Sequence, residues 1–379
     1  MTTEQIVIYA GDTELEEFSF NPDLILLFVS PSFKNLDLLK NFRELYPDSI
    51  ITGCSTSGEI EDINVHDHSV VATAISFDKS RVEYNEVYVP SINKSRLAGT
   101  ELVDKFEQKG LKHLFVLSEG LNINGTSLVN GLKHQSDQQY SITGGLAGDE
   151  TKFGRTFVIT NDMEIRENMI TGIGFYGDDL KVGYGSLGGW DSFGVDRIVT
   201  KSRGNILYEI DGEPVLDLFR NFLGDQAKNL PATGLLFPLS VRIKANDNPV
   251  VRTVIAMNEE EKSLTFAGNI PKGATVRLMK ANMERLINGA EGAAELSIED
   301  IGNTHTDLAI LVSSVGRRLV LNQLIEEEVE AVRDVIGEDA TIAGFYSYGE
   351  IAPYISGTKC ELHNQTMTIT TFSESDIEG

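Results

Sequence analysis

Three stretches of the chain repeat one pattern, which restricts the possible folds more than any other feature of the sequence. Each stretch begins with an apolar run ending in serine, passes through a loop and a helical segment, and returns as a second apolar run. That second run enters a glycine-bracketed turn followed by an acid: "GCSTSGE" at 53–59, "GGLAGD" at 144–149 and "GFYSYGE" at 344–350. Strand, crossover helix and strand of this length indicate parallel pairing with a right-handed crossover.

A third apolar run follows each turn, at 69–77, 168–177 and 366–372. These runs are richer in β-branched residues and alternate more clearly, which predicts antiparallel pairing. The sheets should therefore be mixed. We predict an α/β fold of the mixed α+β kind, with two related halves built from repeated strand–loop–helix–strand–glycine-turn units.

The 379 residues of the chain suggest two or three domains at roughly 150 residues each. Turn signals gather near 211–214, and Pro214 suits the start of a helix. We therefore expect one domain at 23–213 and a second at 214–373. No proline- or serine-rich linker separates them, so we expect the two halves to pack together.

Composition disfavours several classes of partner. Lys and Arg number 32 against 57 Asp and Glu, a formal net charge of −25, which argues against nucleic acid or an anionic membrane surface as a partner. The two cysteines do not make a disulfide scaffold, so a reducing compartment is expected. The first residues lack a signal-peptide pattern, and the apolar run at 24–29 is too short to span a membrane. We expect a cytoplasmic protein.

The glycine turns are the candidate ligand site, because glycine lets a ligand approach the backbone and strand ends of open α/β sheets are common binding positions. Serine hydroxyls, backbone amides and acids at that edge suit a small zwitterion, with an acid for its ammonium and an arginine for its carboxylate. The alternative is that these are tight turns capped by their acids. The candidate ligand-binding residues are Ser30, Gly53, Cys54, Ser55, Gly58, Glu59, Ser118, Gly144, Gly148, Asp149, Ser313, Arg317, Arg318, Tyr346, Gly349 and Glu350.

Other motifs give weaker signals. The "GCSTSGE" turn is not a phosphate loop, because Glu59 stands where that loop needs lysine. "GYGSLGG" at 183–189 fits a dinucleotide motif but precedes no helical pattern, so we interpret it as a flexible glycine loop. Turn amides could activate Cys54 as a nucleophile, but the sequence offers no convincing base, and we expect no enzymatic activity.

A haem iron can be held by one histidine, and His363 in "KCELHNQTMT" is the candidate axial ligand. A hydrogen-bonded structural histidine is the alternative interpretation. The other histidines are scattered along the chain, so we expect no metal-ion site.

Several motifs together resemble the FIST sensory proteins over residues 23–373, with an N-terminal and a C-terminal FIST domain. They are "GCSTSGEI", "GGLAGD", "EIDGEPVLDLF", "GRRLVLNQLIEEEVEAV", "IAGFYSYGEIAP" and "CELHNQTMTITTF". The resemblance implies an intracellular signal-transduction sensor without catalytic activity that binds small ligands, amino acids among them. It also implies a haem alternative, since some members are described as haem-bound nitric-oxide sensors that regulate a histidine kinase or a cyclic-di-GMP enzyme.

We therefore expect a sensor for a small ligand, an amino acid or similar metabolite. A haem-based nitric-oxide sensor is the first alternative, and a cysteine-dependent enzyme using Cys54 is the second. The sequence shows no kinase, cyclase or DNA-binding segment of its own. Its output should act through a separate signalling protein such as a histidine kinase or diguanylate cyclase.

Overall fold

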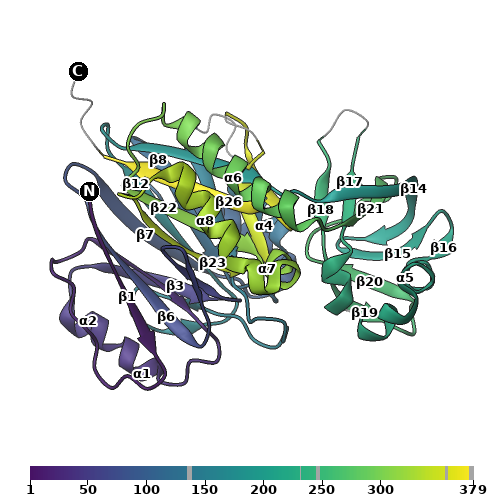
Figure 1. Cartoon of the computed structure of the whole chain (residues 1–379), viewed down its shortest axis with the longest axis horizontal. Coiled ribbons are helices and arrows are strands. Elements are labelled where there is room, and N and C mark those ends of the chain that lie inside the picture. Colours follow the sequence, from purple (N-terminus) through teal and green to yellow (C-terminus); the bar gives the residue numbers. More distant parts are fainter. Residues whose placement is uncertain (135–138, 231, 245–247, 355–356, 375–379) are drawn as a thin grey trace.

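The computed structural model describes residues 1–134, 139–230, 232–244, 248–354 and 357–374. Figure 1 shows a large body beside a smaller lobe. The body contains three six-stranded sheets, and a fourth sheet forms the lobe from residues 191–280. With 25% helix and 40% strand, the fold is mixed α/β, as the sequence predicts.

The three body sheets share one strand order. The first contains β1 (Thr2–Tyr9), β6 (Ser69–Ser76), β2 (Leu24–Val29), β3 (Ile50–Ser55), β10 (Val158–Ile159) and β11 (Ile165–Arg166). The second contains β7 (Arg81–Tyr88), β12 (Met169–Tyr176), β8 (Leu111–Ser118), β9 (Ser141–Leu146), β24 (Gly349–Pro353) and β25 (Cys360–His363). The third contains β13 (Lys181–Leu187), β26 (Met367–Ser373), β22 (Leu308–Ser314), β23 (Thr341–Ser347), β4 (Glu59–Glu61) and β5 (Asn64–His66).

The predicted pairings are confirmed in all three sheets. The pairs β2–β3, β8–β9 and β22–β23 are parallel. The runs that follow the glycine turns, β6, β12 and β26, pair antiparallel with β2, β8 and β22. Each repeat thus contributes four neighbouring strands of one sheet.

The last two strands of each sheet come from a different repeat. Hairpin β4–β5 joins β23, β10–β11 joins β3, and β24–β25 joins β9. Each glycine turn is therefore the place where the chain leaves its own sheet for a neighbouring one. This cyclic exchange interlocks the three repeats.

Helices cover the outer faces of the body sheets (Figure 1). They are α1 (Leu36–Leu39), α2 (Asn41–Leu45), α3 (Ser95–Asp104), α4 (Gly125–Leu132), α6 (Met283–Asp300), α7 (Val315–Leu321) and α8 (Ile325–Ile336), with short 3-10 turns η1 (Ile92–Lys94) and η4 (Asn322–Leu324). On α8, Val329, Val332 and Ile336 are buried, and the helix ends at Gly337 with φ +94°, a conformation that glycine adopts without strain. No helix in these described ranges is long and apolar enough to cross a membrane.

The apolar runs are continuous because their strands are covered on both faces. On β2, Leu24, Leu26 and Phe28 enter a central core shared by all three sheets. The alternate residues Ile25 and Leu27 pack into a second core beneath α1 and α2. The centre of the body is therefore filled by side chains from all three repeats.

The lobe is inserted between β13 and α6 of the third repeat. It contains β14 (Asp191–Arg203), β15 (Ile206–Ile210), β16 (Glu213–Pro214), α5 (Val215–Leu223), η2 (Gly224–Asn229), η3 (Ala232–Leu236), β17 (Leu239–Arg242), β18 (Val250–Arg252), β19 (Val254–Asn258), β20 (Ser263–Phe266) and β21 (Thr275–Lys280). Its described pairings are all antiparallel. Residues 211–214 lie inside this lobe, where β15 turns into β16.

The glycines at 183–189 have a different role from the flexible loop that the sequence suggests. Residues 181–187 form β13, and α6 packs directly on this strand. A Cβ atom at Gly183 would lie 2.0 Å from the carbonyl oxygen of Ser297, and one at Gly185 would lie 2.0 Å from that of Ala293. The glycines are needed because the helix backbone approaches the strand so closely.

Candidate functional site

The three predicted glycine turns meet one another inside the body. The Ser57 amide donates to the Tyr346 carbonyl at 2.7 Å, and the Gly148 amide donates to the Ser55 carbonyl at 2.9 Å. The Tyr348 amide donates to the Leu146 carbonyl at 3.1 Å. We call residues 53–59, 144–149 and 344–350 the turn ring. In these contacts, one backbone amide of each turn donates to a carbonyl of a neighbouring turn.

The acid of each turn caps nearby donors. Glu59 accepts from Thr56 and, at 2.7 Å, from the Ser69 hydroxyl. Asp149 accepts from the Tyr348 hydroxyl and from three backbone amides at 153–155. Burial raises the pKa of Glu59 to about 7.

Glu350 is the third of these acids. It accepts from the Ser347 hydroxyl at 2.9 Å and from the Thr366 amide and hydroxyl at 3.1 and 2.8 Å. Burial raises the pKa of its carboxyl to about 8, because an apolar surrounding disfavours the charged form.

The predicted cations have internal partners. Arg317 is fully buried against Glu328 at 2.7 Å, and its guanidinium also donates to the backbone carbonyls of Gly188 and Leu286. It thereby ties together the two chain segments that connect the lobe to the body. Arg318 donates to the Ser57 carbonyl and pairs with Asp67 at 2.5 Å.

The remaining predicted residues are also buried within or beside the turn ring. Gly144 has φ +145°, and a Cβ there would lie 1.9 Å from the Val116 carbonyl oxygen. Burial raises the pKa of the Cys54 thiol well above its ordinary value. The buried set comprises Ser30, Gly53, Cys54, Ser55, Gly58, Ser118, Gly144, Gly148, Ser313, Tyr346 and Gly349. The structure brings the turns together, and their role in ligand binding stays a prediction.

His363 lies on β25, and its imidazole Nε2 is 3.1 Å from the Ala352 carbonyl oxygen. Burial lowers the pKa of this histidine to about 4, so the ring is neutral near pH 7. Its Nε2 would have to leave this carbonyl to reach a haem iron. In this arrangement His363 does not fit the role of a haem axial ligand, and we assign no function to haem.

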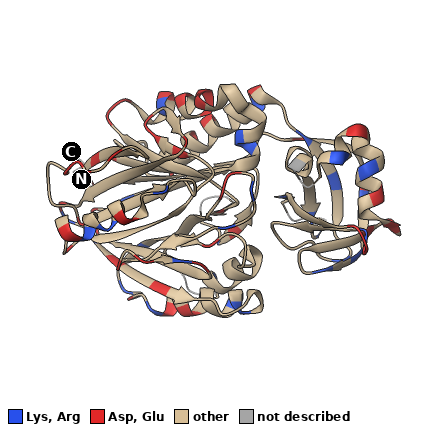
Figure 2. Ribbon diagram, turned by 90° about the horizontal axis from the view of Figure 1, so that it is seen from below, with Lys and Arg blue, Asp and Glu red and all other residues tan. Residues whose placement is uncertain are grey.

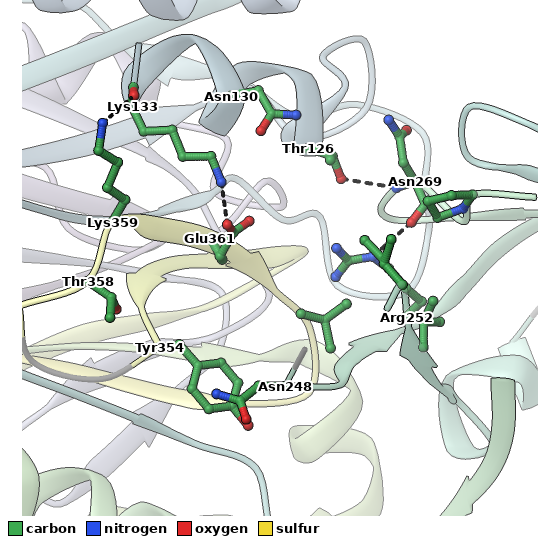
Figure 3. Close-up of a pocket in the computed structure, with 14 residues that line it drawn as sticks. Thr126, Asn130, Lys133, Asn248, Arg252, Asn269, Tyr354, Thr358, Lys359 and Glu361 are labelled. Carbon is green, nitrogen blue, oxygen red and sulfur yellow. Dashed lines mark hydrogen bonds and ion pairs between the residues drawn. The ribbon is translucent and has the colours of Figure 1, made fainter. Parts of the chain in front are cut away.

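A pocket of about 570 Å³ lies between the lobe and the body, and we call it the interlobe pocket (Figure 3). The body contributes α4, its following residue Lys133, and residues Tyr354, Thr358, Lys359 and Glu361. The lobe contributes β17, β18 and residues 269–271. Its lining residues are Thr126, Asn130, Lys133, Val241, Ile243, Asn248, Val250, Arg252, Asn269, Pro271, Tyr354, Thr358, Lys359 and Glu361.

Arg252 is the most buried charged group of this pocket, with 4% of the residue exposed. Its Nε donates to the Asn269 carbonyl at 3.3 Å, and its Nη1 donates to the carbonyls of Val251 and Leu362 at 2.9 and 3.0 Å. Burial lowers its pKa to about 10, an effect that the charge of Glu361 opposes. The guanidinium points into the pocket (Figure 3).

An ion pair stands on the opposite wall. Lys133, at the end of α4, pairs with Glu361 of β25, and the Lys359 ammonium donates to the Lys133 carbonyl at 3.2 Å. The side chains of Lys133 and Glu361 are 19% and 44% exposed. The pocket therefore presents fixed charges of both signs beside several amide and hydroxyl groups.

The lobe is fastened to the body around this pocket. The Gln365 side-chain amide donates to the Leu235 carbonyl at 2.9 Å and to the Thr253 hydroxyl at 3.1 Å. Asn269 of the lobe donates through its backbone amide to the Thr126 hydroxyl at 3.0 Å. A molecule in the pocket would touch both sides of this junction.

The sequence reasoning missed this pocket. Its charged residues lie far apart in the chain, and none belongs to the repeated turns. The signal that could have indicated it is Arg252 inside the apolar run "PVVRTVIAM", because an arginine is rarely buried there without a specific partner.

The distribution of charge also distinguishes the lobe. Residues 191–280 contain 12 Lys and Arg against 11 Asp and Glu, which leaves 20 against 46 for the rest of the chain. Figure 2 shows both acidic and basic residues on the body and on the lobe. The interlobe pocket therefore borders the least acidic part of the molecule.

Two protein-family models match this chain. Residues 23–213 match the FIST N domain, and residues 216–353 match the FIST C domain. The chain is 25% identical over 238 residues to the uncharacterized protein MJ1623 of Methanocaldococcus jannaschii, covering 55% of this chain and 44% of that protein.

A cyanuric acid hydrolase from A. caulinodans is 10% identical, with 78% of this chain and 99% of that chain covered, at a TM-score of 0.18. A likeness at that level supports no conclusion about fold or activity. FIST domains are sensory domains found in signal transduction proteins. The two domain matches together cover most of the chain, which therefore belongs to the FIST family.

Proposed function

We propose that this chain is an intracellular sensor that binds a small ligand, an amino acid or similar metabolite, in the interlobe pocket. It catalyses no reaction and signals through a separate partner protein such as a histidine kinase or diguanylate cyclase. The sensory role of FIST domains supports the signalling part of this proposal. The buried Arg252 supports the binding part.

Arg252 differs from the other buried arginines. Among the described residues, three arginines are buried. Arg317 pairs with Glu328, and Arg333 pairs with Asp62. Arg252 has no described carboxylate within ion-pair distance and donates to backbone carbonyls alone. A buried charge without a counter-ion is costly, so a ligand carboxylate is the partner that this position favours.

The position of the pocket offers a route from binding to signalling. Arg252 belongs to the lobe, and its Nη1 already donates to Leu362 of the body at 3.0 Å. A ligand that contacts both walls binds best when lobe and body keep one particular arrangement. Binding would therefore shift the population toward that arrangement, and the partner protein would recognise it.

Thermal-shift measurements against a panel of amino acids and small metabolites test this function. A ligand at 100 times its Kd should stabilise the protein by about 2.7 kcal/mol. Arg252→Lys keeps the charge but loses the planar fork that grips a carboxylate, so the same ligand should bind at least about tenfold more weakly.

Arg220→Lys is the matched control, because Arg220 pairs with Glu259 on the lobe away from the pocket lining. This variant should keep the wild-type response. The proposal is wrong if no member of the panel stabilises the wild-type protein, or if the stabilising ligand acts equally on Arg252→Lys.

A further inference from the structure

The interlobe pocket is lined by four charged side chains, and three of them, Lys133, Arg252 and Glu361, restrict its ligand further. Lys133 and Glu361 form an ion pair on the body side, and Arg252 faces them from the lobe (Figure 3). Glu361 lies close enough to Arg252 for its charge to raise the pKa of the guanidinium. Glu361 is the one carboxylate among the described residues that line the pocket.

Lys133, Glu361 and Arg252 differ in whether they have an ion-pair partner. Lys133 is neutralised by Glu361, whereas Arg252 has no ion pair of its own among the described residues. The ammonium of Lys359, the fourth charged side chain of the lining, donates to the Lys133 carbonyl at 3.2 Å. A ligand with two carboxylates and one ammonium would give each of the other three groups an opposite charge.

We propose that the ligand is an acidic amino acid. Its α-carboxylate binds Arg252, its ammonium binds Glu361, and its side-chain carboxylate binds Lys133. This assignment rests on the function proposed above and specifies its ligand class.

Binding in this way is an exchange of ion pairs. The bond between Lys133 and Glu361 opens, and each of the two side chains gains an opposite charge from the ligand. Balanced exchange avoids leaving a partly buried charge without a partner, which is the costly outcome in a pocket of low dielectric. The pocket volume of about 570 Å³ lies in the range of roughly 300–1,000 Å³ that small-molecule sites occupy.

The same exchange predicts discrimination against close analogues. A side-chain amide in place of the second carboxylate cannot neutralise Lys133 once Glu361 has turned to the ammonium. A dicarboxylate without an ammonium places its negative charge beside Glu361. Each analogue should therefore bind at least about tenfold more weakly, since one charge-assisted hydrogen bond is lost.

Isothermal titration of the full chain tests these preferences. L-glutamate and L-aspartate are compared with L-glutamine and L-asparagine, and with glutarate and succinate. We expect one of the two acidic amino acids to bind most tightly, with its own amide and its own dicarboxylate each at least about tenfold weaker.

Two variants assign the preferences to residues. Lys133→Met should abolish the preference for the acid over its amide, and Glu361→Gln should abolish the preference for the amino acid over the dicarboxylate. Both side chains are partly exposed, so we expect the variants to fold. Lys262→Met and Asp217→Asn remove an ion pair of 2.7 Å on the lobe surface and are the matched controls.

The outcomes separate the two proposals. If the amides bind as tightly as the acids and Arg252→Lys weakens both, the acidic ligand class is wrong and the sensor function stands. If the acid-over-amide preference survives in Lys133→Met, the assignment of Lys133 is wrong. If no amino acid or metabolite binds the wild-type chain, the proposed function itself fails.

Discussion

Replacing Glu350 by glutamine should change how the stability of this protein depends on pH. The carboxyl group is fully buried and has a pKa of about 8, against 4.5 when unperturbed, because burial disfavours its charged form. Between these two values the folded protein binds a proton that the unfolded chain has lost. The stabilising contribution is therefore complete below pH 4.5 and is lost as the pH rises through 8.

The size of the effect follows from the two pKa values. Between pH 5 and pH 8, the titration of this one carboxyl should lower the free energy of unfolding by about 3 to 4 kcal/mol. In the variant Glu350→Gln, the new side-chain amide can accept from Thr366 and donate to Ser347, and it does not titrate. The variant should therefore lose about that much less stability over the same pH range.

Urea denaturation followed by circular dichroism at pH 5, 6.5 and 8 measures this difference. Glu326→Gln, an exposed position on α8, controls for the change in net charge and should keep the wild-type pH slope. Equal losses of stability in the wild-type protein and Glu350→Gln between pH 5 and pH 8 would refute the reasoning.

Three further predictions concern the buried body. Gly148→Ala should destabilise by about 1–3 kcal/mol, because the added Cβ would lie 2.3 Å from a serine hydroxyl of the first turn; an unchanged melting temperature in calorimetry would contradict the packing of the turn ring. Arg317→Met leaves Glu328 buried without its partner and should cost about 3–5 kcal/mol, measurable by chemical denaturation; a loss below ~1 kcal/mol would contradict the buried pair. Cys54 and Cys360 should resist a thiol reagent until the protein unfolds, because burial raises the pKa of both thiols, that of Cys360 to about 12; rapid native labelling of Cys54 would favour the enzyme alternative.

Much of the body could be predicted from the sequence because its signals are local. Continuous apolar runs such as 24–29 indicate strands buried on both faces, and the α8 pattern ends at a glycine. The β-branched runs after the turns indicate the antiparallel strands, and the hairpin of β19 and β20 follows from its charged turn. Each of these inferences needs only neighbouring residues.

The exchange of hairpins could not be predicted in the same way. β4 has three residues and β10 has two, too few to show a periodic pattern. Their partners β23 and β3 are chosen by contacts between distant repeats. The glycine turns could be recognised, but their burial depends on this exchange.

The interlobe pocket was missed for the same physical reason. Lys133, Arg252 and Glu361 lie in three separate segments and meet only because the lobe folds against the second sheet. The local sequence around Lys133 and Glu361 gives no sign of a binding site, and only the arginine inside an apolar run is unusual. Sequence reasoning therefore placed the zwitterion site at the turns, where the acids accept from hydroxyls and backbone amides and the arginines pair with acids outside the turns.

Hydrogen exchange measured with and without L-glutamate tests the location of the ligand site most directly. If the ligand occupies the interlobe pocket, amide exchange should slow in segments 124–133, 250–253 and 359–363. Exchange in the turn ring should change little, because its amides are bonded already. Slower exchange at 53–59 and 344–350, with the pocket segments unchanged, would contradict the account.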